Sequence, residues 1–263
     1  MGYIQNPKTR DSGILCAIPQ KGKCPINCSD CFFNSGRSYL EPLDQNLPNM
    51  PDPDFANNNG YVIRFNDGND SANNITFVMQ RAIVYKDKFY NTANGWAVRK
   101  FDAPVVLTLN PGKDTDKRFY DMGAPAPVNL MFVRVRVNTW NLPLVDACAQ
   151  RYTKLGVPVV LTFMAYWEGV DKIPLFHKRN YECKRRTTNE YMCISDKARD
   201  KIIQRYANNP LVTTCGKTIT DCKCKDCGNC MKYYRISLAK MQKGPALYKK
   251  LTELSGIPLG TTE

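Results

Sequence analysis

Three cysteines with a regular spacing lie within eight residues of one another in the first part of the chain: Cys24, Cys28 and Cys31, in a C-x3-C-x2-C pattern. Three thiolates at this spacing can fold around one corner of an iron-sulfur cubane. A structural zinc ion and an electron-transfer cluster normally take a fourth protein ligand, and no obvious fourth thiol lies nearby. The pattern therefore predicts a [4Fe-4S] cluster with one iron open to a substrate.

A second group of cysteines occupies sixteen residues near the end of the chain: Cys215, Cys222, Cys224, Cys227 and Cys230. Five thiols at such density predict a metal site. Two interpretations remain open, a second [4Fe-4S] cluster and a zinc knuckle with four cysteine ligands. The C-x2-C pairing of a zinc knuckle is matched by Cys224 with Cys227, or by Cys227 with Cys230.

The chain has a single histidine, His177, and this excludes several reaction classes. An HExxH zinc site and a two-histidine, one-carboxylate iron site each need two histidines. No G-x-S-x-G segment is present that would give His177 a serine nucleophile as a partner. We interpret His177 as a surface or packing residue.

Composition and charge limit the classes of partner that we expect for this protein. The 263 residues are 43% hydrophobic and 23% charged, which is typical of globular proteins. No apolar run approaches the roughly 20 residues that span a bilayer, and no secretory signal is evident, so we expect a cytoplasmic protein without a membrane partner. Residues 171–263 hold 19 Lys and Arg against 9 Asp and Glu. This excess favours an anionic substrate such as a nucleotide, nucleic acid or phosphorylated metabolite.

Strand-like and helix-like segments alternate along the chain. Apolar runs predict six strands, and apolar residues at helical spacing predict helices between them. The strands are expected at 13–18, 61–65, 104–109, 130–137, 157–166 and 211–214, and the helices at 73–91, 142–156 and 195–207. This order indicates an α/β fold, either a full or partial parallel barrel or an open sheet, with its chemistry at the carboxyl ends of the strands.

The three-cysteine motif directly after a first strand resembles that of the radical S-adenosylmethionine (SAM) superfamily. The resemblance implies a partial (β/α)6-type barrel over residues 13–214, preceded by an arm (1–12) and followed by a basic, cysteine-rich extension (215–263). It also implies that Cys24, Cys28 and Cys31 hold the [4Fe-4S] cluster, which binds SAM. An electron donor such as flavodoxin or ferredoxin would reduce the cluster. SAM would then be cleaved to a 5′-deoxyadenosyl radical that abstracts a substrate hydrogen.

The same resemblance implies SAM-binding positions at the strand ends. The residue before the third cysteine, usually aromatic in this family, is Asp30, so Phe32 and Phe33 are expected to supply the aromatic wall of the adenine pocket. A polar turn after the second strand would hold the methionyl amine, and Arg134 or Arg136 would bind the carboxylate through its forked guanidinium. The turn consists of Asn66, Asp67, Gly68, Asn69 and Asp70, and further polar strand-end positions are Thr108, Asn110, Asn138 and Met164.

Two other functions stay open at this point. A zinc-knuckle protein that binds nucleic acid without catalysis would use both cysteine groups as structural sites, and a peptide-modifying radical SAM enzyme would use the extension for a peptide substrate. Iron and zinc contents separate the first of these from the enzyme, because the enzyme requires iron at the first cysteine group.

Overall fold

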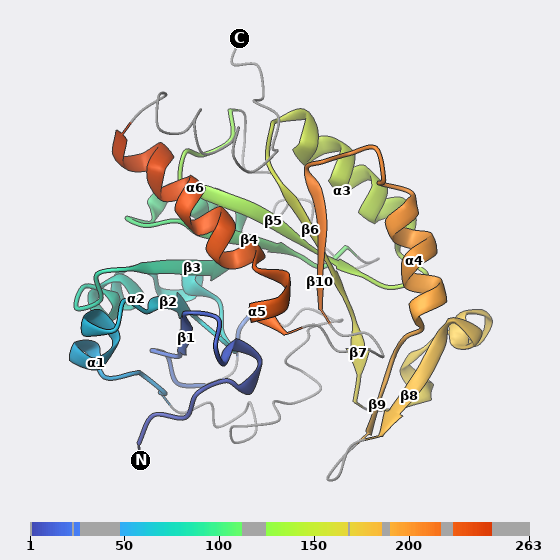
Figure 1. Ribbon diagram of the computed structural model, residues 1–263, viewed down its shortest axis with the longest axis horizontal. Coiled ribbons are helices and arrows are strands. Elements are labelled where there is room, and N and C mark those ends of the chain that lie inside the picture. The colour runs from blue at the N-terminus through green and yellow to red at the C-terminus, as the bar shows by residue number, and fades with distance from the viewer. Residues whose placement is uncertain are drawn as a thin grey trace.

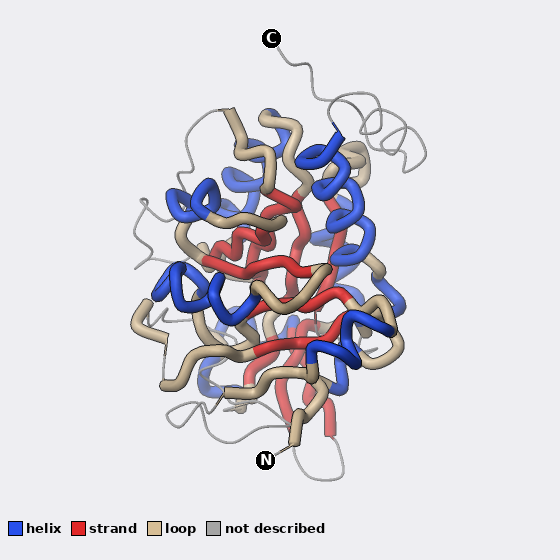
Figure 2. The backbone as a smooth tube through the Cα atoms, turned by 90° about the vertical axis from the view of Figure 1, so that its left-hand side faces the viewer, coloured by secondary structure: helices blue, strands red, loops and turns tan. Residues whose placement is uncertain are grey.

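The computed structural model describes residues 2–22, 24–26, 48–111, 125–167, 169–185, 190–216 and 223–243. Its centre is a seven-stranded, all-parallel sheet that curls into a half-barrel, with the strand order β1-β2-β3-β4-β5-β6-β10 (Figures 1 and 2). The strands are β1 (Ile14–Ala17), β2 (Val62–Phe65), β3 (Lys88–Thr92), β4 (Val105–Leu109), β5 (Leu130–Val137), β6 (Val159–Phe163) and β10 (Val212–Gly216).

A small antiparallel sheet is attached beyond the end of β6 (Figure 1). It has the order β7-β9-β8 and is formed by β7 (Ala165–Tyr166), β8 (Tyr181–Arg185) and β9 (Glu190–Ile194). Met164 is the one residue between β6 and β7, so this sheet continues directly from the carboxyl end of a central strand.

Helices cover both faces of the central sheet. The α-helices are α1 (Pro53–Asn58), α2 (Ile75–Ala82), α3 (Leu142–Lys154), α4 (Asp196–Gln204), α5 (Cys224–Cys227) and α6 (Asn229–Lys243). The 3₁₀-helices are η1 (Pro7–Thr9), η2 (Ser71–Asn74), η3 (Gly95–Lys100), η5 (Val170–Lys172) and η6 (Leu175–Asn180). None of the helices in the described residues is long and apolar enough to cross a membrane.

The prediction of six strands was wrong, because the sheet has seven. The missing strand is β3, which overlaps the end of the segment 73–91 that was predicted as one helix. Helix α2 ends at Ala82, and Phe89, which falls on the helical stripe of the sequence, is a fully buried strand residue. A short strand such as β3 contains too few residues to show its own period against an adjoining helix.

The antiparallel strands β8 and β9 were also not predicted. Three of the five residues of β8 are charged, and most of its side chains are exposed or only partly buried, whereas β9 has one charged residue and is only five residues long. Neither strand has the continuous apolar run that marks the buried strands of a parallel sheet, and β8 lies at the edge of its sheet.

Each face of the central sheet packs into its own hydrophobic core. The side chains of a strand point alternately to the two faces, so each strand contributes to both cores. The outer face packs against α1 to α4 through residues such as Ala56, Val78, Val145 and Ile202. The opposite face, which we call the inner face, packs against α6. Its apolar residues from the sheet are Ile14, Val62, Phe89, Val106, Phe132 and Val160, together with Leu211 directly before β10.

Helix α6 closes the amino-terminal half of the inner face, across the middle strands (Figure 1). Tyr233 is 1% exposed and its ring centroid lies 5.4 Å from that of Phe132. The hydroxyl of Tyr234 donates a hydrogen bond to Asp87 Oδ1 at 2.9 Å, just before β3 begins. Since this half is filled by side chains, the carboxyl half of the inner face is where a ligand could be held.

Candidate functional site

The carboxyl half of the inner face is lined by polar side chains. In the six central strands β1 to β6, the residue two positions after the apolar inner-face residue points to the same side and is polar or a thiol. These residues are Cys16, Arg64, Asn91, Thr108, Arg134 and Thr162. Cys215 on β10 pairs in register with Thr162 and so lies at the same level of the sheet. Hydrogen-bonding groups thus line the inner face near the carboxyl ends of the strands. The apolar residues nearer the amino ends of the strands pack against α6.

The loop after β1 and the loop after β2 meet at this edge. Asn69 donates a hydrogen bond from Nδ2 to the carbonyl oxygen of Gly22 at 3.2 Å. Gly22 lies two residues before Cys24, which is partly buried. The polar turn after β2 and the start of the cysteine motif are therefore adjacent, as the strand order requires. Cys28, Cys31, Phe32 and Phe33 lie outside the described residues.

The carboxylates of the polar turn after β2 are engaged by the protein itself. Asp67 accepts hydrogen bonds from Asn6 Nδ2 at 2.7 Å and from Arg64 Nη2 at 3.0 Å. Gly68 has φ +136°, a conformation that residues with a side chain rarely adopt. The turn also presents the buried Oδ1 of Asn66, which has no hydrogen-bond partner in the structure.

Asp70 fastens this turn to the end of β3. Its carboxylate accepts hydrogen bonds from Thr92 Oγ1 at 2.7 Å and from the backbone N–H groups of Ala72 and Ala93. Burial raises the pKa of Asp70, while these hydrogen bonds act in the opposite direction. Asp70 thus positions the turn and does not present a free carboxylate to a ligand.

Two predicted arginines lie on β5 in the carboxyl half of the inner face. Arg134 donates a hydrogen bond from Nη1 to Asn91 Oδ1 on β3, at 3.4 Å. Arg136 lies two residues further along and places Nη1 3.4 Å from the sulfur of Met164. The structure therefore brings Arg136 and Met164 together, as expected for residues at the ends of adjacent strands.

The other predicted strand-end residues are placed differently. Thr108 pairs in register with Arg134 across β4 and β5, and Asn110 follows the end of β4. Asn138 accepts hydrogen bonds from the backbone N–H groups of Trp140 and Asn141. The side-chain oxygen of Asn138, Oδ1, therefore stabilises the turn that leads into α3.

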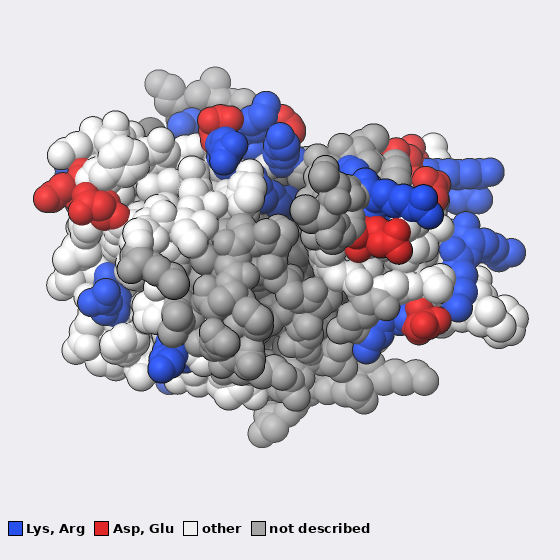
Figure 3. Space-filling view, turned by 90° about the horizontal axis from the view of Figure 1, so that it is seen from below, with Lys and Arg blue, Asp and Glu red and all other residues white. Residues whose placement is uncertain are grey.

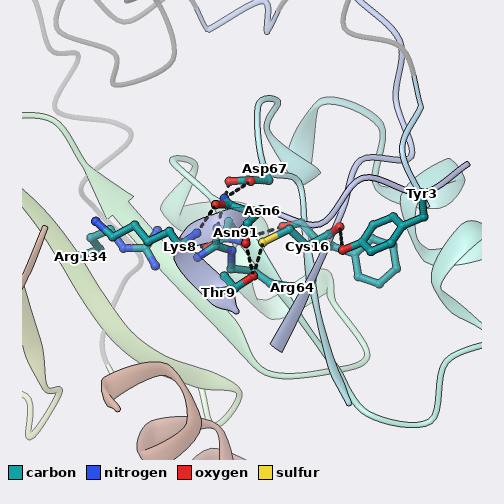
Figure 4. Close-up of polar contacts among 10 residues, drawn as sticks. Tyr3, Asn6, Lys8, Thr9, Cys16, Arg64, Asp67, Asn91 and Arg134 are labelled. Atoms are coloured by element: carbon teal, nitrogen blue, oxygen red, sulfur yellow. Dashed lines mark hydrogen bonds and ion pairs between the residues drawn. The ribbon is translucent and has the colours of Figure 1, made fainter. Parts of the chain in front are cut away.

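Three cations gather in the polar half, and sequence reasoning found only one of them. Lys8 from η1, Arg64 from β2 and Arg134 from β5 are drawn in Figure 4 together with Asn91. All three cations act electrostatically on the thiol of Cys215. Lys8, Arg64 and Asn91 were not predicted as site residues from the sequence. The signal for the latter two was in the sequence, because each lies two residues after an apolar strand residue of the inner face. Lys8 carries no such pattern.

Four cysteines of the C-terminal group are described, and they lie beside these cations. Cys215, the last inner-face residue of β10, and Cys227, the last residue of α5, have Sγ atoms 4.0 Å apart. The hydrogen bond from the Cys227 thiol, together with Lys8, Arg134 and Arg64, lowers the pKa of Cys215. Burial raises the pKa of Cys224 to about 11 and also raises that of Cys230.

Among the described residues, no group of three or more His, Cys, Asp or Glu side chains is arranged to hold a metal ion. The predicted ligand Cys222 lies outside the described residues, as do Cys28 and Cys31. Neither cysteine group is thus present in full in the part of the chain that the structure describes.

The lone histidine lies near the strand ends but packs among aromatic rings. His177 Nδ1 is 2.9 Å from Thr139 Oγ1, and its ring lies 5.6 Å from that of Trp140. Trp140 in turn packs against Tyr166 and Tyr181. This placement agrees with the interpretation of His177 as a packing residue.

Part of the basic excess lies on the small antiparallel sheet and the 3₁₀-helices before it. Residues 169–185 carry Lys172, Lys178, Arg179, Lys184 and Arg185 against Asp171 and Glu182. Seen from below, Lys and Arg side chains gather on the side where β8 and β9 lie (Figures 1 and 3). A positive surface of this kind attracts anions.

Comparison with known proteins assigns no family. No family model matches the chain, and no curated protein or solved structure is significantly similar to it.

Proposed function

We propose that this protein is a radical SAM enzyme, with Cys24, Cys28 and Cys31 as ligands of a [4Fe-4S] cluster. The hydrogen bond from Asn69 to the carbonyl of Gly22 carries the proposal. It joins the start of the three-cysteine motif to the polar turn after β2, at the carboxyl edge of a parallel half-barrel. In such folds ligands bind at the carboxyl ends of the strands.

The side chains at this edge fit a zwitterionic cosubstrate. Three thiols in the motif suit an iron-sulfur cluster that leaves one iron open. The buried oxygens Asn66 Oδ1 and Thr162 Oγ1 have no hydrogen-bond partner in the structure and are available to a ligand. When bound and reduced, the cluster would supply the electron that cleaves SAM to a 5′-deoxyadenosyl radical.

The residues of this chain would bind and orient SAM. Arg134 offers a guanidinium to the methionyl carboxylate, and Asn91 fixes the orientation of that guanidinium. Helix α6 fills the other half of the inner face with apolar side chains, which limits access of water to a radical from that side. The substrate is an anion drawn by the basic surface of residues 169–185, and its class includes nucleotides, nucleic acid and phosphorylated metabolites.

Metal analysis separates this proposal from a zinc-knuckle protein that binds nucleic acid. We expect anaerobically prepared protein to be brown and to hold at least roughly four irons per chain, the content of one cubane. Cys24→Ala should lose this iron, whereas Cys148→Ala, at a partly buried thiol on α3, should retain it. A colourless protein with stoichiometric zinc and no iron at the first group would overturn the proposal.

A further inference from the structure

Two of the described C-terminal cysteines, Cys215 and Cys227, have their thiols in direct contact. Cys227 Sγ lies 4.0 Å from Cys215 Sγ, although twelve residues of sequence separate them. A disulfide bond has a length of about 2.05 Å, so an approach of about 2 Å would join the two sulfurs.

A hydrogen bond between residues close to Cys215 and Cys227 holds the two cysteine-bearing segments together. Asn229, the first residue of α6, donates a hydrogen bond from Nδ2 to the carbonyl oxygen of Thr214 at 3.0 Å. Thr214 precedes Cys215, and Asn229 follows Cys227 by two residues. The end of β10 and the end of α5 are thus tied together beside the sulfurs, so the contact follows from the fold.

Helix α5 is able to make the remaining approach. It is a single turn of four residues, separated from α6 by Gly228 in the left-handed conformation with φ +61°. A short helix depends on its surroundings for its position.

Cys215 and Cys227 are also the two described C-terminal thiols that a reagent in solution can reach most easily. Cys215 and Cys227 are partly exposed, whereas Cys224 and Cys230 are each 7% exposed. Thiol-disulfide exchange needs access of the reagent to the attacking sulfur. The described cysteines also form no group arranged to hold a metal ion.

We propose that Cys215 and Cys227 are a redox-active dithiol, which closes to a reversible disulfide between the end of β10 and α5. The oxidant is a small-molecule disulfide such as oxidised glutathione. One cysteine attacks it and releases one glutathione thiol, and the second cysteine displaces the other glutathione from the mixed disulfide. Two protein thiols are oxidised and one external disulfide is reduced to two thiols. This inference does not rest on the proposed function.

The test uses the full chain in glutathione buffers of graded reduced-to-oxidised ratio, under anaerobic conditions. Free thiols are blocked by alkylation, and peptides are mapped by mass spectrometry without reduction. We expect a Cys215–Cys227 crosslink, the loss of two free thiols per chain, and full reversal by dithiothreitol. Cys183→Ser, at an exposed thiol on β8, should leave the crosslink unchanged.

Three results would overturn the proposal. They are the absence of any crosslink in oxidising buffer, a crosslink of Cys215 or Cys227 to Cys222 or Cys224 in place of the expected one, and protection of both thiols by bound iron or zinc. Peptide mapping of the wild-type chain decides among these without any variant. Cys215→Ser and Cys227→Ser should each abolish the crosslink, and circular dichroism checks that both variants fold.

Discussion

Arg134 on β5 donates a hydrogen bond to Asn91 on β3, across the intervening strand β4. The two side chains meet because the inner face curves and because each lies two residues beyond an apolar strand residue of that face. Asn91 also donates a hydrogen bond from Nδ2 to the carbonyl oxygen of Phe65 at 2.8 Å. Asn91 therefore links three strands and sets the direction of the Arg134 guanidinium.

Replacement of Arg134 is the first prediction. A hydrogen bond between charged groups contributes about 1.5–3 kcal/mol, so Arg134→Ala should weaken SAM binding about 10- to 100-fold. Equilibrium dialysis with labelled SAM measures the dissociation constant. Arg81→Ala, at an exposed residue on α2, should leave it unchanged. Unaltered SAM binding by folded Arg134→Ala would remove Arg134 from the site.

Packing of α6 on the inner face gives the second prediction. Tyr233→Ala should lower the free energy of unfolding by about 3–5 kcal/mol, since it empties a fully buried aromatic position against Phe132. Tyr234→Phe should cost only about 1 kcal/mol, because it removes the hydrogen bond to Asp87 but keeps the ring. Urea denaturation measures both. Arg235→Ala, at an exposed residue of the same helix, should change stability by less than about 0.5 kcal/mol.

The hydrogen bonds of Asp70 give the third prediction. Asp70→Ala leaves the Thr92 hydroxyl and the backbone N–H groups of Ala72 and Ala93 without their acceptor. The expected loss of stability is about 3 kcal/mol. Asp54→Ala, at an exposed carboxylate on α1, should change it by less than about 0.5 kcal/mol. Equal effects of the two substitutions in urea denaturation would show that Asp70 does not fasten the turn to β3.

A pH dependence is expected where α3 meets the end of α4, and this is the fourth prediction. Burial raises the pKa of Asp146, but hydrogen bonds from Arg205 and Tyr206 outweigh it, so the pKa lies below its usual 3.8. Stability from this lowered pKa is present above pH 3.8 and is lost as the pH falls through the folded-state pKa.

Asp146→Asn tests that dependence. The side chain of Asp146 is 36% exposed, so its ion pair with Arg205 should contribute no more than about 1 kcal/mol at pH 7. The difference in unfolding free energy between wild type and variant should shrink toward zero as the pH falls below 3.8. A difference that stays constant from pH 7 to pH 2 would contradict the assignment.

Sequence reasoning found the strands that are long and mostly apolar, such as β5, because their burial on both faces leaves a nearly continuous hydrophobic run. It missed β3, whose Phe89 falls on the apolar stripe of the helix that was predicted for residues 73–91. It identified Arg134 and Arg136 from residue type and place in a strand. Contacts between distant segments, such as that of Lys8 with the inner face, depend on how η1 folds back and have no local pattern.

The most direct test of the proposed function is SAM cleavage. Anaerobically reconstituted protein is incubated with dithionite and SAM, and 5′-deoxyadenosine is measured by chromatography. Wild type and Cys148→Ala should form it, and Cys28→Ala should form none. If iron-loaded wild-type protein forms no 5′-deoxyadenosine, or Cys28→Ala forms it at the wild-type rate, the assignment of the three-cysteine motif is wrong.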